Sequence, residues 1–158
     1  MFQINRQIDY ALLFMVALAE RYNQGYTSLR LLARERKLPY RFLAKITISL
    51  RKENLIVAQE GVNGGYRLVN SPERIFLKKI FEALGGNLSL VRCNHDEASC
   101  PSFCQCSSKR FWRELQEAIN QIASKYSLAD LVGHSPGVNL PNVKSFGVKK
   151  VRIFKSKF

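Results

Sequence analysis

Apolar residues recur every three or four positions in three stretches near the start of the chain, which predicts three helices. The first spans about residues 5–22, with Asn5 as its N-cap. Thr27 or Ser28 caps the second, whose apolar positions are Leu29, Leu32 and Ala33. The third covers YRFLAKITISLRKE and ends at Asn54. Its expected inward residues are Phe42, Leu43, Ile46 and Leu50, and its expected outward residues are Arg41, Lys45, Ser49 and Lys52.

After this helix the pattern changes to two short extended runs. The runs LIVAQE and YRLV flank GVNGG, in which Asn63-Gly64 is a strong signal for a hairpin. A short helix follows and stops at Gly85-Gly86; its apolar residues are Leu77, Ile80, Phe81 and Leu84. We therefore predict two antiparallel strands and a fourth helix.

The rest of the chain holds a cysteine-rich segment, a long helix and a tail. Residues 93–106, CNHDEASCPSFCQC, contain all four cysteines, lack periodicity and include Pro101, which indicates a loop. An amphipathic helix starts after Ser107 or Ser108, with one apolar face made of Trp112, Leu115, Ile119 and Ile122. From Gly133 onward the chain is rich in Gly, Pro and Lys, so we expect a mobile basic tail.

The charge distribution adds a class of partner to this outline. The net charge is +13, divided as +6 in residues 1–75, zero in 76–107 and +7 in 108–158. Such a balance favours anionic partners, either nucleic acid or a membrane surface. The longest apolar run near the start, at positions 10–19, is too short to cross a bilayer and has no cationic leader or cleavage site. We therefore expect a cytoplasmic protein that does not enter the membrane.

The order of helix, helix, short turn, helix and glycine-tipped hairpin is that of a winged helix-turn-helix. The predicted fold class is mainly α with a small β-hairpin wing, extended by a long helix. In this fold the third helix turns its basic face toward the major groove of double-stranded DNA, and the wing lies near phosphates. Arg36 and Lys37 are expected to flank the DNA backbone. The candidate DNA-binding residues are Ser28, Arg30, Arg34, Tyr40, Arg41, Lys45, Asn63, Gly64, Gly65 and Arg67.

The cysteine spacing C-x6-C-x3-C-x-C leaves several chemistries open. Disulfides are disfavoured because cytoplasmic thiols stay reduced and the chain has enough apolar residues for a core. Structural zinc usually shows separated pairs of close cysteines, and no C-x2-C pair exists in the sequence. A thiol redox switch needs only two cysteines, whereas a flexible loop of thiolates suits an iron–sulfur cluster. His95 lies in the loop, but no oxyanion element or orienting acid pattern indicates an enzyme.

Four sequence blocks together are typical of one family of regulators. They are QIDYALLFMVALA, the helix-turn-helix SLRLLARERKLPYRFLAKITISLRKENLI, the wing GVNGGYRLVNSPERIFLKKI, and the cysteine loop running into FWREL. Over about residues 2–132 the chain resembles the IscR/NsrR/CymR-type winged-helix iron–sulfur transcriptional regulators, the Rrf-two (Rrf2) family. The resemblance implies a homodimer on a palindromic operator, with the long helix as the dimer interface.

The resemblance also implies a set of cluster ligands. The family's three cysteines match Cys93, Cys100 and Cys106, which leaves Cys104 as an additional thiol and an alternative ligand. Lys109 stands where the [2Fe–2S] members have a histidine. Asp9 matches the aspartate that the nitric-oxide-sensing members supply to a [4Fe–4S] centre from the other subunit. The resemblance therefore favours [4Fe–4S] over [2Fe–2S], with Asp9 of the partner subunit as the fourth ligand.

Two further positions depart from the family. Ala44 and Glu60 stand where the cluster-supply sensors have an acidic and a basic residue, so the operator sequence is not transferable from a relative. We predict a non-enzymatic regulator whose operator affinity is controlled by an iron–sulfur cluster that senses nitric oxide, redox state or iron supply. The alternative is a cluster-free thiol-redox or zinc-stabilised DNA-binding regulator. The predicted divisions are a winged helix-turn-helix (1–84), a cluster-binding loop (85–107), a dimerisation helix (108–132) and a tail (133–158).

Overall fold

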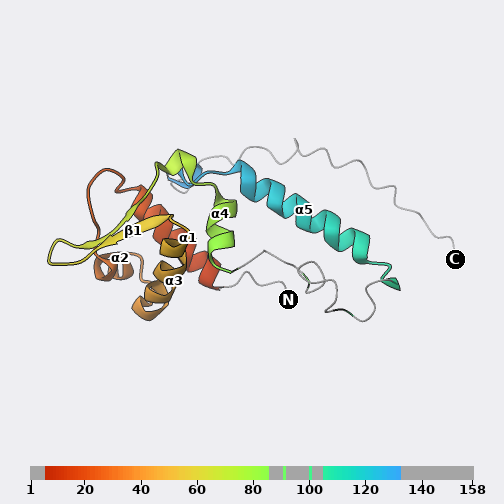
Figure 1. Ribbon diagram of the computed structural model, residues 1–158, viewed down its shortest axis with the longest axis horizontal. Coiled ribbons are helices and arrows are strands. Elements are labelled where there is room, and N and C mark those ends of the chain that lie inside the picture. The colour runs from red at the N-terminus through yellow and green to blue at the C-terminus, as the bar shows by residue number, and fades with distance from the viewer. Residues whose placement is uncertain (1–5, 86–90, 92–99, 101–104, 133–158) are drawn as a thin grey trace.

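The computed structural model describes residues 6–85, 91, 100 and 105–132 (Figure 1). The predicted tail, the start of the first helix and most of the cysteine loop lie outside these residues. The helices and strands, in chain order, are α1 (Arg6–Ala19), α2 (Leu29–Glu35), α3 (Tyr40–Lys52), β1 (Ile56–Gln59), β2 (Gly65–Leu68), η1 (Pro72–Arg74), α4 (Leu77–Ala83), α5 (Lys109–Lys125) and η5 (Ala129–Leu131). Here η marks a 3-10 turn. The order confirms the predicted winged helix-turn-helix followed by a long helix.

Helices α1, α2 and α3 bury their apolar faces in one core. Phe14 and Met15 of α1 and Leu32 of α2 all belong to this core, and their side chains are fully buried. Three residues of α3 complete the core at helical spacing: Leu43, Ile46 and Leu50. Because these residues occupy one face of α3, the opposite face is left at the surface of the protein. None of the helices in the described ranges is long and apolar enough to cross a membrane.

The wing is an antiparallel hairpin that is anchored to the helix-turn-helix. Strands β1 and β2 pair in the register Ile56 with Leu68 through Gln59 with Gly65. Tyr66 also pairs with Thr27, through N–H···O bonds of 3.0 and 2.9 Å, so the segment that leads into α2 adds a third extended segment to the hairpin. A Cβ on Gly65 would lie 2.3 Å from the carbonyl oxygen of Thr27. Glycine is therefore required where the wing meets the start of α2.

The segment after α5 returns to the winged-helix core. Phe76 and Ser127 form an isolated antiparallel bridge, and the N–H of Leu128 donates to the carbonyl of Ile75 at 2.7 Å. The Leu128 side chain is fully buried in the core that α1–α3 form. Asp130 accepts bonds from the Ser127 N–H and hydroxyl at 2.7 and 2.8 Å, which stabilises the turn η5. These contacts fix one end of α5, whose other end points away from the winged helix (Figure 1).

Two local expectations were wrong. Phe42 was expected to face inward, but it lies at the edge of the helix bundle and is 46% exposed, although its ring contacts Tyr10 of α1. The predicted hairpin is confirmed, with the Gly64 N–H donating to the Gly61 carbonyl and Val62 and Asn63 in the central positions of its turn. The first helix ends at Ala19 rather than near residue 22, and the following residues form a turn.

Candidate DNA-binding surface and cysteine site

The exposed face of α3 carries the cationic residues that the sequence singled out. Arg41 and Lys45 are both exposed and lie one helical turn apart, and Tyr40 at the start of the helix is 48% exposed. Lys52 is exposed at the other end of the helix. The buried residues on the opposite side hold α3 on the core, so this basic face has a fixed orientation. Such a face on a rigid helix suits the major groove of B-DNA.

Helix α2 presents its predicted cations to solvent as well. Arg30 and Arg34 are exposed one turn apart, and Ser28 is exposed at the N-cap without a capping bond from its hydroxyl. Ala44, between the exposed cations of α3, is half-buried. The exposed cations of α2 and α3 thus make two separate basic helix surfaces, joined by the short turn at residues 36–39.

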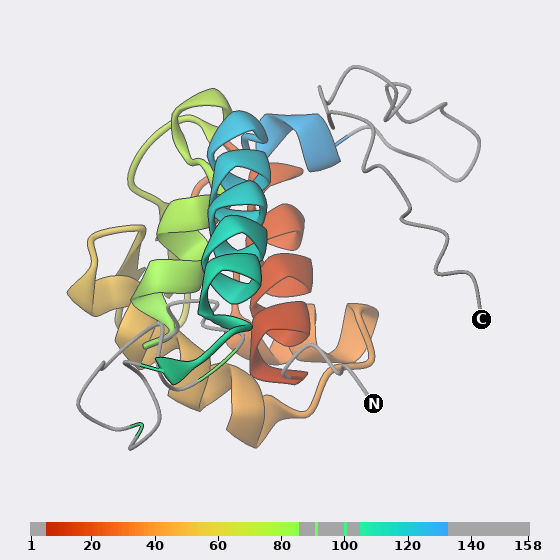
Figure 2. The same ribbon diagram turned by 90° about the vertical axis from the view of Figure 1, so that its right-hand side faces the viewer.

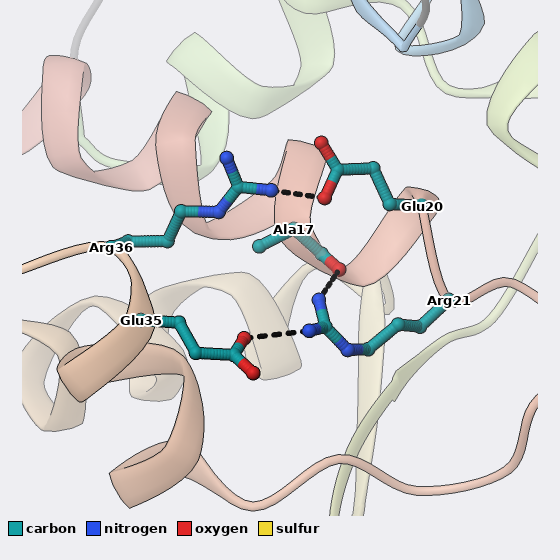
Figure 3. Close-up of polar contacts among 5 residues, drawn as sticks. All are labelled: Ala17, Glu20, Arg21, Glu35 and Arg36. Atoms are coloured by element: carbon teal, nitrogen blue, oxygen red, sulfur yellow. Dashed lines mark hydrogen bonds and ion pairs between the residues drawn. The ribbon is translucent and has the colours of Figure 1, made fainter.

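Arg36 has a structural contact that the sequence did not reveal. Its guanidinium pairs with Glu20 after α1, and Arg21 pairs with Glu35 of α2 at 2.6 Å (Figure 3). Arg21 also donates to the Ala17 carbonyl at 3.2 Å. Each ion pair joins the end of α1 to the end of α2. In one pair the cation follows α1, and in the other the acid does. Arg36 is therefore engaged in holding the two helices together, whereas Lys37 is exposed.

The wing carries the remaining predicted residues. Asn63 is exposed in the hairpin loop, Gly64 and Gly65 are half-buried, and Arg67 is exposed on β2. The Arg67 guanidinium lies over the ring of Tyr26, 5.2 Å from its centroid, which restrains the cation beside the wing. Both residues line a groove of about 380 Å³ between the end of α1 and β2. Tyr26 has no periodic or motif signal in the sequence, so only the tertiary structure identifies it.

A second contact missed by the sequence connects α1 with α3, the predicted DNA-recognition helix. The rings of Tyr10 and Phe42 meet edge to face, with centroids 5.7 Å apart. Next to this contact, Gln7 of α1 and Arg41 and Lys45 of α3 line a cleft of about 270 Å³. Asp9, the predicted fourth cluster ligand, is exposed in the first turn of α1, immediately before Tyr10. The start of α1 therefore lies against α3, the helix that is predicted to face DNA.

The described part of the cysteine segment contains two of the four thiols. Cys100 and Cys106 are free and half-buried, and Cys106 precedes α5 by three residues. The Cys106 Sγ lies 3.3 Å from the Ser108 Oγ. This hydrogen bond, with a further bond from the Ser108 backbone, lowers the pKa of the Cys106 thiol below its usual value. A lowered pKa favours the thiolate, which is the form that binds metals.

Two of the predicted ligands, Cys93 and Cys104, lie outside the described residues. Among residues 6–85, 91, 100 and 105–132, no three His, Cys, Asp or Glu side chains gather as a metal site. Thiolate donors of the kind that Cys100 and Cys106 provide nonetheless suit iron–sulfur chemistry. The residues that are described thus fit a cluster in the type of donor they offer.

The helix after the cysteines is amphipathic and leaves much of its apolar face exposed. Phe111 is 59% and Ile122 is 41% exposed, while Ala123 near its end is buried. Phe111 and Trp112 meet edge to face at 5.1 Å. Figure 2 shows α5 nearest the viewer, with α4 on one side and α1 on the other. The contacts of α5 within the chain thus leave apolar surface for a further partner.

Comparison with known proteins connects this geometry to transcriptional regulation. Residues 4–134 match the Rrf2 family, described as iron-dependent transcriptional regulators. The regulator NsrR of Halalkalibacterium halodurans is 31% identical over 82% of this chain and 90% of its own length. The regulator CymR of Bacillus subtilis is 27% identical over 85% of this chain and 93% of its own length. The structure of CymR, the global cysteine regulator of B. subtilis, superposes with a TM-score of 0.70 over 85% of this chain and 99% of that one.

Proposed function

The chain belongs to the Rrf2 family of iron-dependent transcriptional regulators, and from this premise we propose a homodimeric, cytoplasmic regulator whose affinity for a palindromic operator is controlled by an iron–sulfur cluster. As a transcriptional regulator of this family it binds DNA and is not an enzyme. The observation that carries the proposal is the basic outer face of α3, held on a fully buried apolar face and placed beside an anchored wing.

The DNA contacts in this proposal divide by role. Arg41 and Lys45 enter the major groove, because they share the exposed face of the recognition helix. Arg30, Arg34 and Ser28 on α2 and Tyr40 at the start of α3 contact the backbone, where their charge and hydrogen-bonding groups position the helix. Arg67 and the wing residues 63–65 lie along an adjacent stretch of backbone. Neutralisation of several phosphates makes the affinity steeply dependent on salt.

Titration of labelled duplex DNA by fluorescence anisotropy tests this part of the proposal. Arg41→Ala is expected to weaken operator binding about tenfold or more, the loss of a good base contact. Lys78→Ala is the matched control, because this cation lies on α4 and pairs with Glu82 at 3.8 Å. Its affinity should equal that of the unaltered protein. Affinity that does not change between low and moderate salt would contradict the proposed surface.

The proposed cluster ligands are Cys93, Cys100 and Cys106 of one subunit and Asp9 of the partner subunit. Support comes from the two described thiols, which are free and half-buried, and from the exposure of Asp9 in α1. When bound, the cluster would supply an iron centre that nitric oxide or oxygen can attack. A carboxylate from the second subunit links the state of the loop to the spacing of the two recognition helices. Loss of that link shifts the population of DNA-binding conformations.

Anaerobic purification tests the cluster directly. The protein is expected to be brown, with visible absorbance that fades on exposure to air or nitric oxide, and Mössbauer spectra should indicate [4Fe–4S] rather than [2Fe–2S]. Replacing Cys93, Cys100 or Cys106 with alanine should abolish the absorbance, whereas Cys104→Ala should retain it. If Cys104→Ala loses the absorbance and Cys106→Ala keeps it, Cys104 is the ligand. Colourless protein that retains stoichiometric zinc would contradict the cluster.

The dimer in this proposal forms along α5. Its exposed apolar residues, Phe111 and Ile122, lie on a helix in which Ala123, near the C-terminal end, is the one buried residue. When the same face of a second copy packs against it, the exposed apolar side chains of both subunits are buried in one symmetric interface. Sedimentation of the full chain is expected to show a dimer, and Phe111→Glu should raise the dissociation constant by at least tenfold. A monomeric protein with full operator affinity would contradict this arrangement.

One comparison favours the second candidate, a cluster-free thiol-redox regulator. CymR, the global cysteine regulator of B. subtilis, superposes on this chain with a TM-score of 0.70. The half-buried Cys106 with its lowered pKa is compatible with oxidation chemistry as well as with metal binding. Operator binding by metal-free protein that changes reversibly with peroxide and dithiothreitol would favour this candidate over the cluster. Metal analysis of the purified protein distinguishes the zinc-stabilised alternative from this cluster-free thiol-redox regulator.

A further inference from the structure

The outer face of the recognition helix contains one large apolar residue, Ile48. Its side chain is 69% exposed, more than any other large hydrophobic residue in the described helices. The helical period places it on the same face as Arg41, Lys45 and Lys52, which are all exposed. The inward residues of α3 are fully buried on the other side. Ile48 is therefore an apolar group within a cationic surface.

The folding of the chain gives no reason for isoleucine at this position. A residue that is two-thirds exposed contributes little to the core, and β-branched residues are weaker helix formers than lysine, arginine or alanine. Single exposed apolar residues are common on protein surfaces, so exposure alone carries no argument. The distinguishing observation is the charge around Ile48. Three cations lie on the same face, so a partner that covers this residue is expected to be a polyanion.

Duplex DNA presents one apolar group in its major groove, the C5-methyl of thymine. Resting on the proposed DNA-binding function, we propose that Ile48 is a specificity-determining residue that contacts a thymine methyl group in each half-site. The stiff χ1 angle of isoleucine holds its methyl groups in one place, which suits discrimination of thymine from cytosine. Arg41 and Ile48 are seven residues apart, or about 10 Å along the helix axis. With α3 lying along the groove, the thymine falls about three base pairs from the base pair that Arg41 contacts.

The test uses full-length protein purified without oxygen and a duplex selected from a random library. Each thymine of the selected site is replaced in turn by uracil, which removes the methyl group and keeps Watson–Crick pairing. At one symmetry-related pair of thymines, uracil is expected to weaken binding about fourfold per half-site, as for the loss of one buried methyl group. Ile48→Ala should weaken binding to the thymine site by a similar factor and be indifferent to uracil at that position.

Two variants complete the experiment. Ile48→Val keeps β-branched methyl groups and should retain sensitivity to uracil. Lys52→Ala removes a neighbouring cation, and it should weaken binding to thymine and uracil sites equally. Because Ile48 is exposed, Ile48→Ala is expected to fold, and circular dichroism with sedimentation checks its helix content and dimer.

Three results would overturn the inference. The first is a selected site in which no uracil replacement weakens binding, and the second is an unchanged uracil effect in Ile48→Ala. The third is dissociation of the Ile48→Ala dimer, which would make the side chain a subunit contact. If the selection enriches no sequence at all, both the proposed operator binding and this inference fail. The three results above overturn only the role of Ile48, so the two kinds of failure are distinguishable.

Discussion

The ring of Tyr10 in α1 meets the ring of Phe42 in α3 edge to face, at an interplanar angle of 89°. Tyr10 follows the exposed carboxylate of Asp9, and Phe42 follows the exposed guanidinium of Arg41. The two rigid rings therefore connect the segment that holds Asp9, the predicted fourth cluster ligand, with the segment that holds Arg41, which is predicted to contact bases in the major groove. In the proposed regulator, a displacement of the start of α1 is therefore carried to the start of the recognition helix.

Loss of this ring contact is expected to be measurable as a coupling free energy. In a double-mutant cycle, Tyr10→Leu and Phe42→Leu should each destabilise the protein, with an interaction energy of about 0.5–1.5 kcal/mol between them. Urea unfolding at constant protein concentration measures the cycle. Tyr22→Leu provides the control partner, because Tyr22 lies in the turn after α1 and its effect should add to that of Phe42→Leu. Additive effects of Tyr10 and Phe42 would show that the rings do not interact.

Glu60 places an acid in the wing loop, between β1 and the exposed Val62. If the wing lies near phosphates, Glu60→Gln should remove a repulsion and tighten operator binding about two- to fivefold at ~0.1 M salt. The salt slope should become steeper by up to about one. Anisotropy titrations across a salt series measure both, with Glu117→Gln on α5 as the control. Weaker binding by Glu60→Gln would instead identify the carboxylate as an acceptor for a cytosine amino group.

Gly65 is predicted to be irreplaceable at the junction of the wing and α2. Gly65→Ala introduces a Cβ that meets the Thr27 carbonyl at 2.3 Å, so the backbone must move. Gly85→Ala is the control, because its φ of +75° carries conformational strain while no atom lies within 4 Å of the added Cβ. Thermal unfolding should show that Gly65→Ala costs at least about 1 kcal/mol more than Gly85→Ala. Equal costs would show that the wing moves away from Thr27 without penalty.

Leu128 attaches the end of α5 to the winged helix, because its fully buried side chain belongs to the core of α1–α3. Leu128→Ala should destabilise the protein by about 2–5 kcal/mol. Leu131→Ala, in the same η5 turn but only half-buried, should cost clearly less. Chemical denaturation measures both, and limited proteolysis should cut the Leu128→Ala variant between α5 and η5 first. Equal stabilities of the two variants would contradict the role of Leu128 as the anchor.

The candidate site was predictable where its residues belong to one helix or one hairpin. Helical spacing alone assigned Leu43, Ile46 and Leu50 to the core, and it thereby assigned Arg41 and Lys45 to the exposed face. It failed for Phe42, whose position on the boundary of that face is decided by a partner thirty-two residues earlier in the chain. The pairing of Arg36 with Glu20 is also non-local, which explains why Arg36 seemed a free cation in the sequence.

By itself, the sequence determined the order of elements, the basic character of the recognition helix and the concentration of thiols between the winged helix and the long helix. These properties depend on residue spacing within single segments, where the period of a helix or strand decides which side chains share a face. Only the tertiary structure decided that Thr27 closes against Tyr66, that Tyr10 meets Phe42, and that Leu128 returns to the core. These contacts join segments far apart in the chain, and their geometry depends on how all the helices pack together.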